Sequence, residues 1–296
     1  MVDILFLGTA CMQPTKERNH PGVLLSYKGE KILFDCGEGI QRQLKLAGVK
    51  PAKISKVLIS HWHGDHVLGL PGLMSTMGAD QFAKRLQIYG PKGSKKYVEF
   101  MLKAFLSTDV IEHEVIEVEE GVIFENEDYY LESYSLKHPG RCVGFSFIEK
   151  DKLRIKVKEA EKMGLSGEIL GDLQKKKKVV FKGKKIDYKD VTYTVRGKKI
   201  SYIADTRPCE GASELASGSD LVISESTYSD ADRIKAKEHM HLTAKEAAMI
   251  ASESGAEKLI LTHISQRYKN PLMLEEEARE IFDNVLMAKD FMKVKV

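Results

Sequence analysis

The chain has 296 residues, of which 43% are hydrophobic and 30% are charged, and its formal net charge is +3. These values are ordinary for a soluble globular protein that is long enough to bury a large core. No stretch approaches the roughly 18 apolar residues of a membrane span, and Asp3 lies where a signal peptide carries basic residues. The four cysteines, Cys11, Cys36, Cys142 and Cys209, form no CxxC pair, which favours a reducing, cytoplasmic environment over a disulfide framework.

Short apolar runs separated by glycine, proline or charged turns predict strands at 4–7, 23–27, 31–34 and 57–60. A helix is predicted over 39–47, a second begins after Val67, and further short strands are expected within 109–134. A polar helix is expected at 157–163, whereas residues 164–185 show little apolar periodicity. Strands at 199–204, 221–224 and 258–262 then alternate with helices at 243–254 and 274–286. This alternation predicts a layered α/β architecture.

A strongly basic segment interrupts this pattern. Residues 149–199 contain 17 Lys and Arg against 8 Asp and Glu, a net charge of +9, so the rest of the chain carries −6. We interpret residues 151–187 as an insertion that projects from the body. A basic segment on a nearly neutral body favours a polyanionic partner, although a solvated lysine-rich surface is the commoner reason for a charge run.

The segment HWHGDH at 61–66 directly follows the apolar run 57–60. Side chains two apart in extended backbone point the same way, so His61 and His63 can reach one metal ion together. Gly64 permits a turn, after which Asp65 and His66 can face a second ion. Imidazole and carboxylate ligands suit zinc, with iron or manganese as alternatives. Three histidines within six positions favour a metal site over coincidence.

Four other polar residues share one context, since each directly follows an apolar run that is predicted to be a strand. They are His138 after 134–137, Asp205 after 200–204, Glu225 after 221–224 and His263 after 258–262. Taken alone, such a residue is more often a cap or a hydrogen-bonding group of the core. Because ligand sites in open α/β sheets gather beyond the carboxyl ends of strands, the recurrence predicts that these residues complete one site.

These residues carry a resemblance to the ribonuclease Z family, the tRNA 3′-processing endonucleases of the metallo-β-lactamase superfamily. Residues 61–66 match the HxHxDH signature of the superfamily, and His138, Asp205 and His263 follow in the order of its later motifs. The resemblance extends from Gly8 to Tyr268 and therefore covers nearly the whole chain.

Shorter stretches resemble further motifs of the family: PTKERN at 14–19, DCGEG at 35–39 followed by Gln41, HLT at 241–243 and THISQRY at 262–268. Two stretches depart from the family pattern. The stretch SEST at 224–227 keeps Glu225 but lacks the histidine that usually precedes it. The stretch GLSG at 164–167 lacks the proline that is frequent in the projecting arm of the family.

The resemblance implies a four-layer αββα metallo-β-lactamase sandwich over residues 1–296 with a protruding basic arm that binds the substrate. It also implies two zinc ions per chain. One ion would be held by His61, His63 and His138 and the other by Asp65, His66 and His263, with Asp205 bridging the two. Two cations about 3.5–4 Å apart share a hydroxide and clamp the attacked phosphate. The attack would leave a 3′-OH on the tRNA and a 5′-phosphate on the trailer.

Three residues are expected to act in the chemistry. Asp65 would orient the attacking water as well as bind metal. A leaving alkoxide needs a proton, and His241, oriented by Glu225, is the candidate general acid, in agreement with the family precedent. The alternative for His241 is a plain residue at a helix N-terminus, because the nearby Thr243 is itself a good N-cap.

Precursor tRNA and a second copy of the chain are the implied partners. In the family the arm docks on the folded tRNA body, often from the partner subunit of a homodimer. Phosphate contacts of the arm would supply affinity without reading sequence. The lysines expected to make them are Lys175, Lys176, Lys177 and Lys178. The residues expected near the tRNA 3′ end are Lys16, Arg18, Asn19 and Arg267.

Three other functions were weighed against this one. A small-molecule hydrolase that cleaves a lactone, thioester or lactam would share the metal ligands, but it needs neither the basic segment nor the loop 14–19. A di-iron oxidoreductase of this fold typically has Glu at the position of His63 and a flavin-binding domain. A catalytically silent RNA-binding module would not need Asp65. The residues therefore favour a zinc-dependent tRNA 3′ endoribonuclease.

Overall fold

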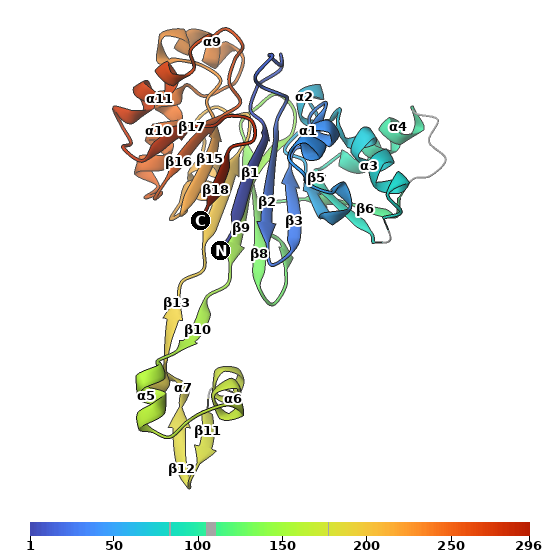
Figure 1. Cartoon of the computed structure of the whole chain (residues 1–296). Coiled ribbons are helices and arrows are strands. Elements are labelled where there is room, and N and C mark those ends of the chain that lie inside the picture. The colour runs from blue at the N-terminus through green and yellow to red at the C-terminus, as the bar shows by residue number, and fades with distance from the viewer. Residues whose placement is uncertain (83, 105–110, 177) are drawn as a thin grey trace.

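Two seven-stranded sheets lie face to face at the centre of the computed structural model (Figure 1), which describes residues 1–82, 84–104, 111–176 and 178–296, without the side chains of 174–176. Each sheet joins antiparallel to parallel strands, and helices cover its outer face (Figure 1). Strands that are covered on both faces are buried along their length and therefore read as continuous apolar runs. The predicted αββα sandwich is confirmed.

The first sheet has the order β18–β1–β2–β3–β4–β5–β6 among the described residues. Its strands β3 to β6 are parallel, so each step between them needs a crossover, which the helices α1 to α4 supply. The elements are β1 (Asp3–Gly8), β2 (Gly22–Tyr27), β3 (Glu30–Phe34), α1 (Ile40–Leu46), the 3₁₀ helix η1 (Pro51–Lys53), β4 (Ile54–Leu58), α2 (Gly64–Val67), α3 (Leu70–Ala79), β5 (Leu86–Pro91), α4 (Ser94–Lys103), β6 (His113–Val118) and β18 (Lys293–Lys295).

The second sheet has the order β17–β16–β15–β14–β9–β8–β7 in the described part of the chain. Strands β14 to β17 are parallel, and α8, α10 and α11 form their crossovers. The elements are β7 (Gly121–Glu125), β8 (Tyr129–Leu136), β9 (Cys142–Glu149), β14 (Lys199–Ile203), α8 (Glu210–Ala216), β15 (Leu221–Glu225), the 3₁₀ helix η2 (Asp230–Asp232), α9 (Arg233–Glu238), α10 (Ala244–Glu253), β16 (Leu259–Thr262), α11 (Leu272–Arg279) and β17 (Val285–Met287).

Aromatic side chains join the two sheets. The ring of Phe34 in β3 lies 6.4 Å from Phe145 in β9 and 5.4 Å from Tyr202 in β14, measured between centroids. Tyr27 in β2 contacts Phe147 in β9 at 5.2 Å. All five side chains are buried. Such pairs add to the free energy gained by burying apolar surface, so the layer between the sheets fixes the position of the strand ends.

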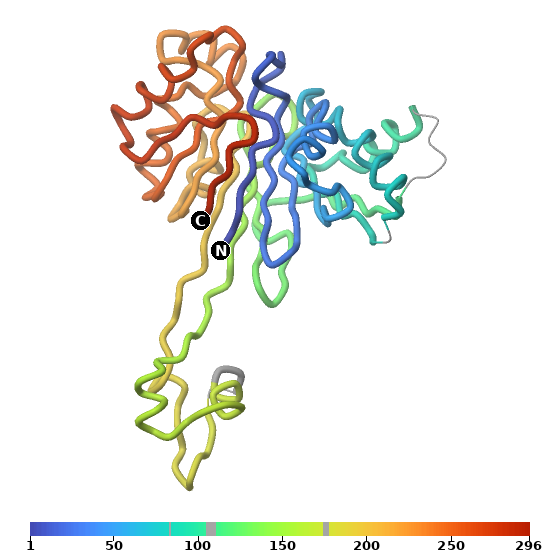
Figure 2. The backbone as a smooth tube through the Cα atoms, viewed as in Figure 1, coloured from blue at the N-terminus to red at the C-terminus, as the bar shows by residue number. Residues whose placement is uncertain are grey.

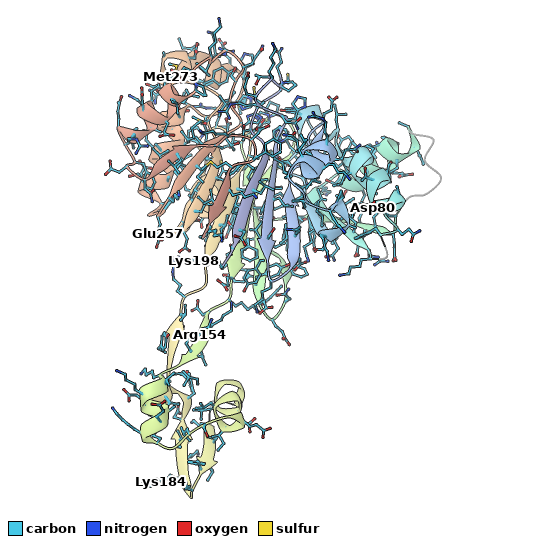
Figure 3. The ribbon with its side chains drawn as sticks, viewed as in Figure 1. Asp80, Arg154, Lys184, Lys198, Glu257 and Met273 are labelled. Carbon is cyan, nitrogen blue, oxygen red and sulfur yellow. The ribbon has the colours of Figure 1, made fainter. Side chains whose placement is uncertain are left out.

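The basic segment forms an arm that extends away from the sandwich (Figure 1). It leaves the body after Glu149 and returns at Lys199, and Figure 3 shows Lys184 at its far end. Its small core contains Ala160, Leu165, Leu173, Ile186 and Val191. Its elements are β10 (Lys152–Ile155), α5 (Val157–Lys162), α6 (Glu168–Lys176), β11 (Lys178–Phe181), β12 (Lys184–Asp187), α7 (Tyr188–Val191) and β13 (Thr192–Val195).

Most predicted elements are present, and the main error concerns the C-terminal helix. A helix was predicted over 274–286, but α11 ends at Arg279 and Leu286 lies in β17, which pairs in parallel with β16. The apolar residues that follow α11 form a strand instead of continuing the helix because they pair with β16 at the edge of the sheet. In the body, strands β5, β9 and β18 and helices α2, α4, α8 and α9 were not predicted. In the arm only the helix at 157–163 was predicted, and the stretch 164–185, which has little apolar periodicity, contains α6 and β11. Residues 109 and 110 of the predicted range 109–134 lie outside the described residues.

The two ends of the described chain lie side by side, because β1 and β18 pair with each other (Figure 2). Within the described ranges, no helix has the length and apolarity needed to cross a membrane.

Candidate metal centre

Several strand ends converge at one edge of the sandwich. The loop after β4 carries His61 and His63, and α2 carries Asp65 and His66. Among the described residues, the potential ligand atoms fall into three groups whose members lie within 4.8 Å of one another: His61, His63, His138 and Asp205; Asp65, His66 and His263; and Asp205, His241 and His263. The structure thus brings all seven predicted ligands together, and Asp205 belongs to two groups.

Three atoms in the middle of this cluster have no hydrogen-bond partner. They are His61 Nε2, His66 Nε2 and Asp205 Oδ1, and no other buried side-chain nitrogen or oxygen of the described residues lacks a partner. Their side chains are 3% exposed or less. A buried polar atom without a partner costs about 1–3 kcal/mol. Three such atoms within one cluster, on side chains that are good metal ligands, fit the binding of divalent cations.

Hydrogen bonds behind the histidines fix which nitrogen faces the centre. Asp35 Oδ2 lies 2.7 Å from His66 Nδ1, and this carboxylate also accepts from Tyr202 Oη at 2.8 Å and from the Ser60 backbone N–H at 2.8 Å. The Met240 carbonyl can only accept, so His138 Nδ1, 2.9 Å away, donates to it. Both histidines therefore present Nε2 to the centre, as histidine ligands of metals generally do when the other nitrogen is hydrogen-bonded.

The charges of His61 and Asp205 suit metal binding. Burial lowers the pKa of His61 well below its ordinary value, so His61 is neutral and its nitrogen lone pair is available. Burial alone would raise the pKa of Asp205, but the nearby His263, His66 and His241 outweigh it and lower this pKa well below its ordinary value. Neutral imidazole and ionised carboxylate are the forms that bind a cation.

His66 differs from His61 in its charge. Burial disfavours the charged imidazole, but the carboxylates of Asp205, Asp35 and Asp65 outweigh burial and raise the pKa of His66 well above its ordinary value. This imidazole must therefore lose a proton when it binds a cation.

His241 and Glu225 form a pair beside the cluster. His241 Nδ1 lies 3.1 Å from Glu225 Oε1, and Glu225 is 1% exposed. Burial disfavours the charged imidazole, but the carboxylates of Glu225 and Asp205 outweigh this and raise the pKa of His241 to about 9. A protonated histidine at the edge of the cluster can give a proton to a leaving group.

The cluster opens to the surface through a cavity of about 510 Å³. His63, Asp65, His241 and Arg267 line this cavity, and the Arg267 guanidinium lies 4.7 Å from the ring centre of Tyr228. Arg267, predicted to contact substrate, therefore shares a cavity with the candidate ligands. The cavity is large enough for a nucleotide-sized group to approach the ligands.

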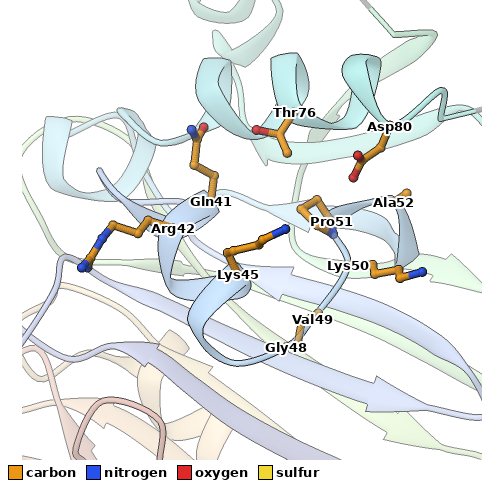
Figure 4. A pocket seen from close by; sticks show the side chains of 10 residues that line it. All are labelled: Gln41, Arg42, Lys45, Gly48, Val49, Lys50, Pro51, Ala52, Thr76 and Asp80. Atoms are coloured by element: carbon orange, nitrogen blue, oxygen red, sulfur yellow. The ribbon is translucent and has the colours of Figure 1, made fainter.

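A larger cavity, of about 770 Å³, lies elsewhere, between α1, η1 and α3 (Figure 4). Its charged residues Arg42, Lys45, Lys50 and Asp80 are exposed, and in Figure 4 Arg42 points away from it. None of the three ligand groups of the described residues contributes to it. The candidate ligands therefore lie at the smaller cavity.

The predicted substrate residues differ in their surroundings. Lys16 is exposed, whereas Arg18 Nη1 donates to Ala288 O at 2.7 Å and to Thr9 Oγ1 at 2.6 Å, and Asn19 Nδ2 donates to Glu38 O at 2.7 Å. The arm elements α6 and β11 lie far from α2, which carries Asp65 and His66 (Figure 1). Lys175 and Lys176 are in α6 but their side chains, like all of Lys177, lie outside the described residues, while Lys178 is exposed in β11.

Sequence reasoning gave no role to two residues that support the site. Asp35 was noted only as part of a motif, although a carboxylate at the end of a buried strand is a signal for such a role. Thr227 Oγ1 donates to Glu225 Oε2 at 2.7 Å and lies 2.8 Å from His263 Nδ1. One hydroxyl thus links the His241–Glu225 pair to a ligand of the cluster, which no spacing in the sequence could indicate.

Comparison with known proteins finds relatives over the full chain. Residues 2–191 match the family model described as anti-Pycsar protein Apyc1, and residues 175–264 match that of the beta-lactamase superfamily domain. The ribonuclease Z of Methanothermobacter thermautotrophicus is 40% identical over 298 residues, which cover 100% of this chain and 97% of that protein. The ribonuclease Z of Chlamydia pneumoniae is 36% identical over 292 residues, covering 98% of this chain and 94% of that protein.

Solved structures agree with these relatives. The crystal structure of the short form of human tRNase Z has a TM-score of 0.74 and 29% sequence identity, and covers 99% of both chains. A long form of RNase Z from yeast, at 20% identity and a TM-score of 0.71, covers 99% of this chain but 42% of that one and supports the fold alone. The relatives also match the region beyond residue 191, where the Apyc1 match ends and where Asp205, Glu225, His241 and His263 lie.

Proposed function

Because the chain belongs to the ribonuclease Z family, with relatives 36–40% identical over its full length, we infer that it is an endoribonuclease that removes 3′ trailers from precursor tRNA. The observation that carries this inference is the cluster of buried histidines and aspartates at the floor of an open cavity, with His241 and Glu225 beside it. A small-molecule hydrolase would share the ligand cluster, but the relatives that match the full chain are ribonuclease Z proteins.

Divalent metal ions would be held by the seven clustered residues. We propose two zinc ions per chain, since the ligands are imidazoles and carboxylates, with Mn²⁺ or Fe²⁺ as alternatives. One group would be His61, His63 and His138, the other Asp65, His66 and His263, with Asp205 shared. When bound, such cations supply Lewis-acid stabilisation of the phosphate and lower the pKa of water to near neutrality.

The chain itself would orient water and deliver a proton. Asp65 Oδ2 lies 3.4 Å from both His66 Nε2 and His263 Nε2. Asp65 lines the cavity, where a lone pair of its carboxylate can accept a hydrogen bond from water. His241 Nδ1 is engaged by Glu225, so its Nε2 is the atom that would protonate the departing 3′ oxygen. The products would be a tRNA with a 3′-OH and a trailer with a 5′-phosphate.

The arm is the proposed contact with the tRNA body. It leaves the sheet at Glu149 and Lys199, and Asp205 lies at the other end of the strand that begins at Lys199. The arm therefore extends away from the metal centre of its own chain (Figure 1). This position favours a homodimer in which the arm of one copy holds tRNA whose 3′ end enters the partner's metal centre.

The free thiols of all four cysteines support a cytoplasmic location.

The function is tested with a precursor tRNA that carries a 3′ trailer, incubated beside a panel of thioesters and lactones. Cleavage at the trailer junction with a 3′-OH on the tRNA is expected with added Zn²⁺ or Mn²⁺, and an Asp205→Asn variant should be inactive. Absence of trailer cleavage under all metal conditions, or rapid turnover of a thioester or lactone instead, would contradict the proposal.

A further inference from the structure

Asp290, in the turn between β17 and β18, holds the connection between β1 and β2. Its Oδ1 accepts from Thr9 Oγ1 at 2.7 Å, and its Oδ2 accepts from the Asn19 backbone N–H at 2.8 Å and from Gln43 Nε2 at 3.0 Å. Both carboxylate oxygens are therefore occupied by donors from β1–β2 and α1. The residue lies 271 positions from Asn19 in the chain, and sequence analysis assigned it no role.

A second chain of contacts runs through Thr9. Its hydroxyl donates to Asp290 and accepts from Arg18 Nη1, which also donates to Ala288 O at 2.7 Å. The side chain of Asn19 donates to Glu38 O at 2.7 Å. Arg18 Nη1 and Asn19 Nδ2 thus bind within the protein and tie the base of the loop to the body.

The other end of this loop faces the metal centre. Residues 12–17 are exposed, and Met12 and Gln13 line the cavity that contains His63 and Asp65. Lys16 is the one cation among residues 12–17, and it is exposed. A loop that is fixed at its base by charge-assisted hydrogen bonds presents its tip in one position.

We propose that Asp290 is a positioning residue that fixes the loop 11–19 beside the metal centre, so that Lys16 and the loop tip meet the 3′ end of the substrate. The proposal rests on the proposed function for the identity of that substrate. It assigns Arg18 and Asn19 to the anchoring of the loop and leaves direct contact with RNA to Lys16.

The test compares Asp290→Asn with the wild-type protein. The variant keeps the shape of the side chain but removes its charge and replaces one acceptor oxygen by an NH₂ group. At the Oδ2 position this group would face the Asn19 N–H donor, and at the Oδ1 position it would stop the Thr9 hydroxyl from donating. We expect faster hydrogen exchange of the amides of 9–19, and a KM for precursor tRNA raised by about tenfold, the effect of losing about one hydrogen bond to a charged group. The kcat and the hydrolysis of bis(p-nitrophenyl) phosphate, which is too small to need the loop, should stay unchanged.

Glu30→Gln is the matched control. Glu30 also accepts from three donors, Ser55 Oγ, Lys56 Nζ and Tyr129 Oη, but it lies in β3 away from the loop. This control should lower stability without changing KM. If Asp290→Asn does not fold, Thr9→Val removes the hydroxyl that links Arg18 to Asp290 and is expected to raise KM in the same way.

The proposal is overturned if Asp290→Asn leaves both the exchange of 9–19 and the KM unchanged, or if Glu30→Gln raises KM equally. Failure of the wild-type protein to cleave any precursor tRNA would instead remove the proposed function. In that case faster exchange of 9–19 in the variant still supports the anchor, and unchanged exchange overturns it.

Discussion

Replacing Glu225 by Gln perturbs the proposed proton donor without changing its size. The Glu225 carboxylate accepts five hydrogen bonds: Oε1 from the backbone N–H groups of Thr206 and Leu242 and from His241, and Oε2 from the backbone N–H and the hydroxyl of Thr227. None of these five donors has to accept a hydrogen bond from residue 225. The glutamine NH₂ group would therefore face a donor in either orientation, and the negative charge beside His241 would be lost.

The size of the effect follows from the pKa of His241. Burial opposes its positive charge, and the carboxylates of Glu225 and Asp205 overcome this opposition to raise the pKa from 6.5 to about 9. That difference corresponds to about 3 kcal/mol in favour of the protonated form. Glu225 is the largest contributor on the raising side, so its neutralisation should lower the pKa of His241 by at least about one unit. Bound cations would lower the pKa in both proteins, and the difference between them is the quantity tested.

The assay is the pH dependence of precursor-tRNA cleavage at saturating metal, from about pH 6 to about pH 10. A general acid is active below its pKa, so the rate should fall as the pH rises through that of His241. In Glu225→Gln this alkaline limb should move to lower pH by at least about one unit, with kcat reduced about 100-fold. Metal content should stay at the wild-type level, and Glu30→Gln should leave the limb in place. An unmoved alkaline limb would refute the role of the pair, and loss of metal would show that Glu225 supports the ligands instead.

Three further outcomes are expected. Adding Zn²⁺ to metal-free protein should raise the Tm measured by calorimetry, because bound metal at 1,000 times its Kd increases the free energy of unfolding by about 4 kcal/mol. Asp205→Asn, which removes a shared ligand, should abolish most of this gain. Phe145→Ala, between the sheets and 0% exposed, should lower the free energy of unfolding in urea by about 3–5 kcal/mol. Substitution of Lys175, Lys176, Lys177 and Lys178 by Ala should weaken precursor-tRNA binding and reduce the slope of log K against log salt by up to about 4, measured by filter binding; unchanged affinity would contradict the role of the arm.

The sequence predicted most of the sandwich because the central strands are mostly buried and contain short apolar runs. The run 57–60, for example, overlaps the end of β4, where Val57 and Leu58 are fully buried. Edge elements carry a weaker signal. Strand β17 has three residues and one of them, Leu286, is only half-buried, so its apolar residues looked like the end of a helix. What decides its conformation is pairing with β16, which local sequence does not record.

The candidate ligands were predictable for a related reason. Parallel strands in one sheet end at the same edge, so polar residues that follow several strands are brought together without any knowledge of the loops. His138, Asp205 and His263 obey this rule. Asp35 follows β3 in the same way but its carboxylate lies against His66 Nδ1. Asp35 and the ligand His263 both have a backbone φ in the left-handed region, 55° and 58°. That conformation is uncommon for a residue other than glycine, and the sequence alone does not reveal it.

The loop 11–19 shows the limit of motif reasoning. The residue types and spacing of PTKERN indicated that the loop matters, and the same letters suggested that Arg18 and Asn19 face the substrate. In the structure both bind the protein, through partners that include Thr9, Ala288 and Asp290. A motif reports which residues a function requires, whereas the direction in which each side chain points depends on contacts that the fold creates. For this loop the decisive contact comes from the opposite end of the chain, so residues that a motif assigns to substrate binding can serve the substrate by holding the loop in place.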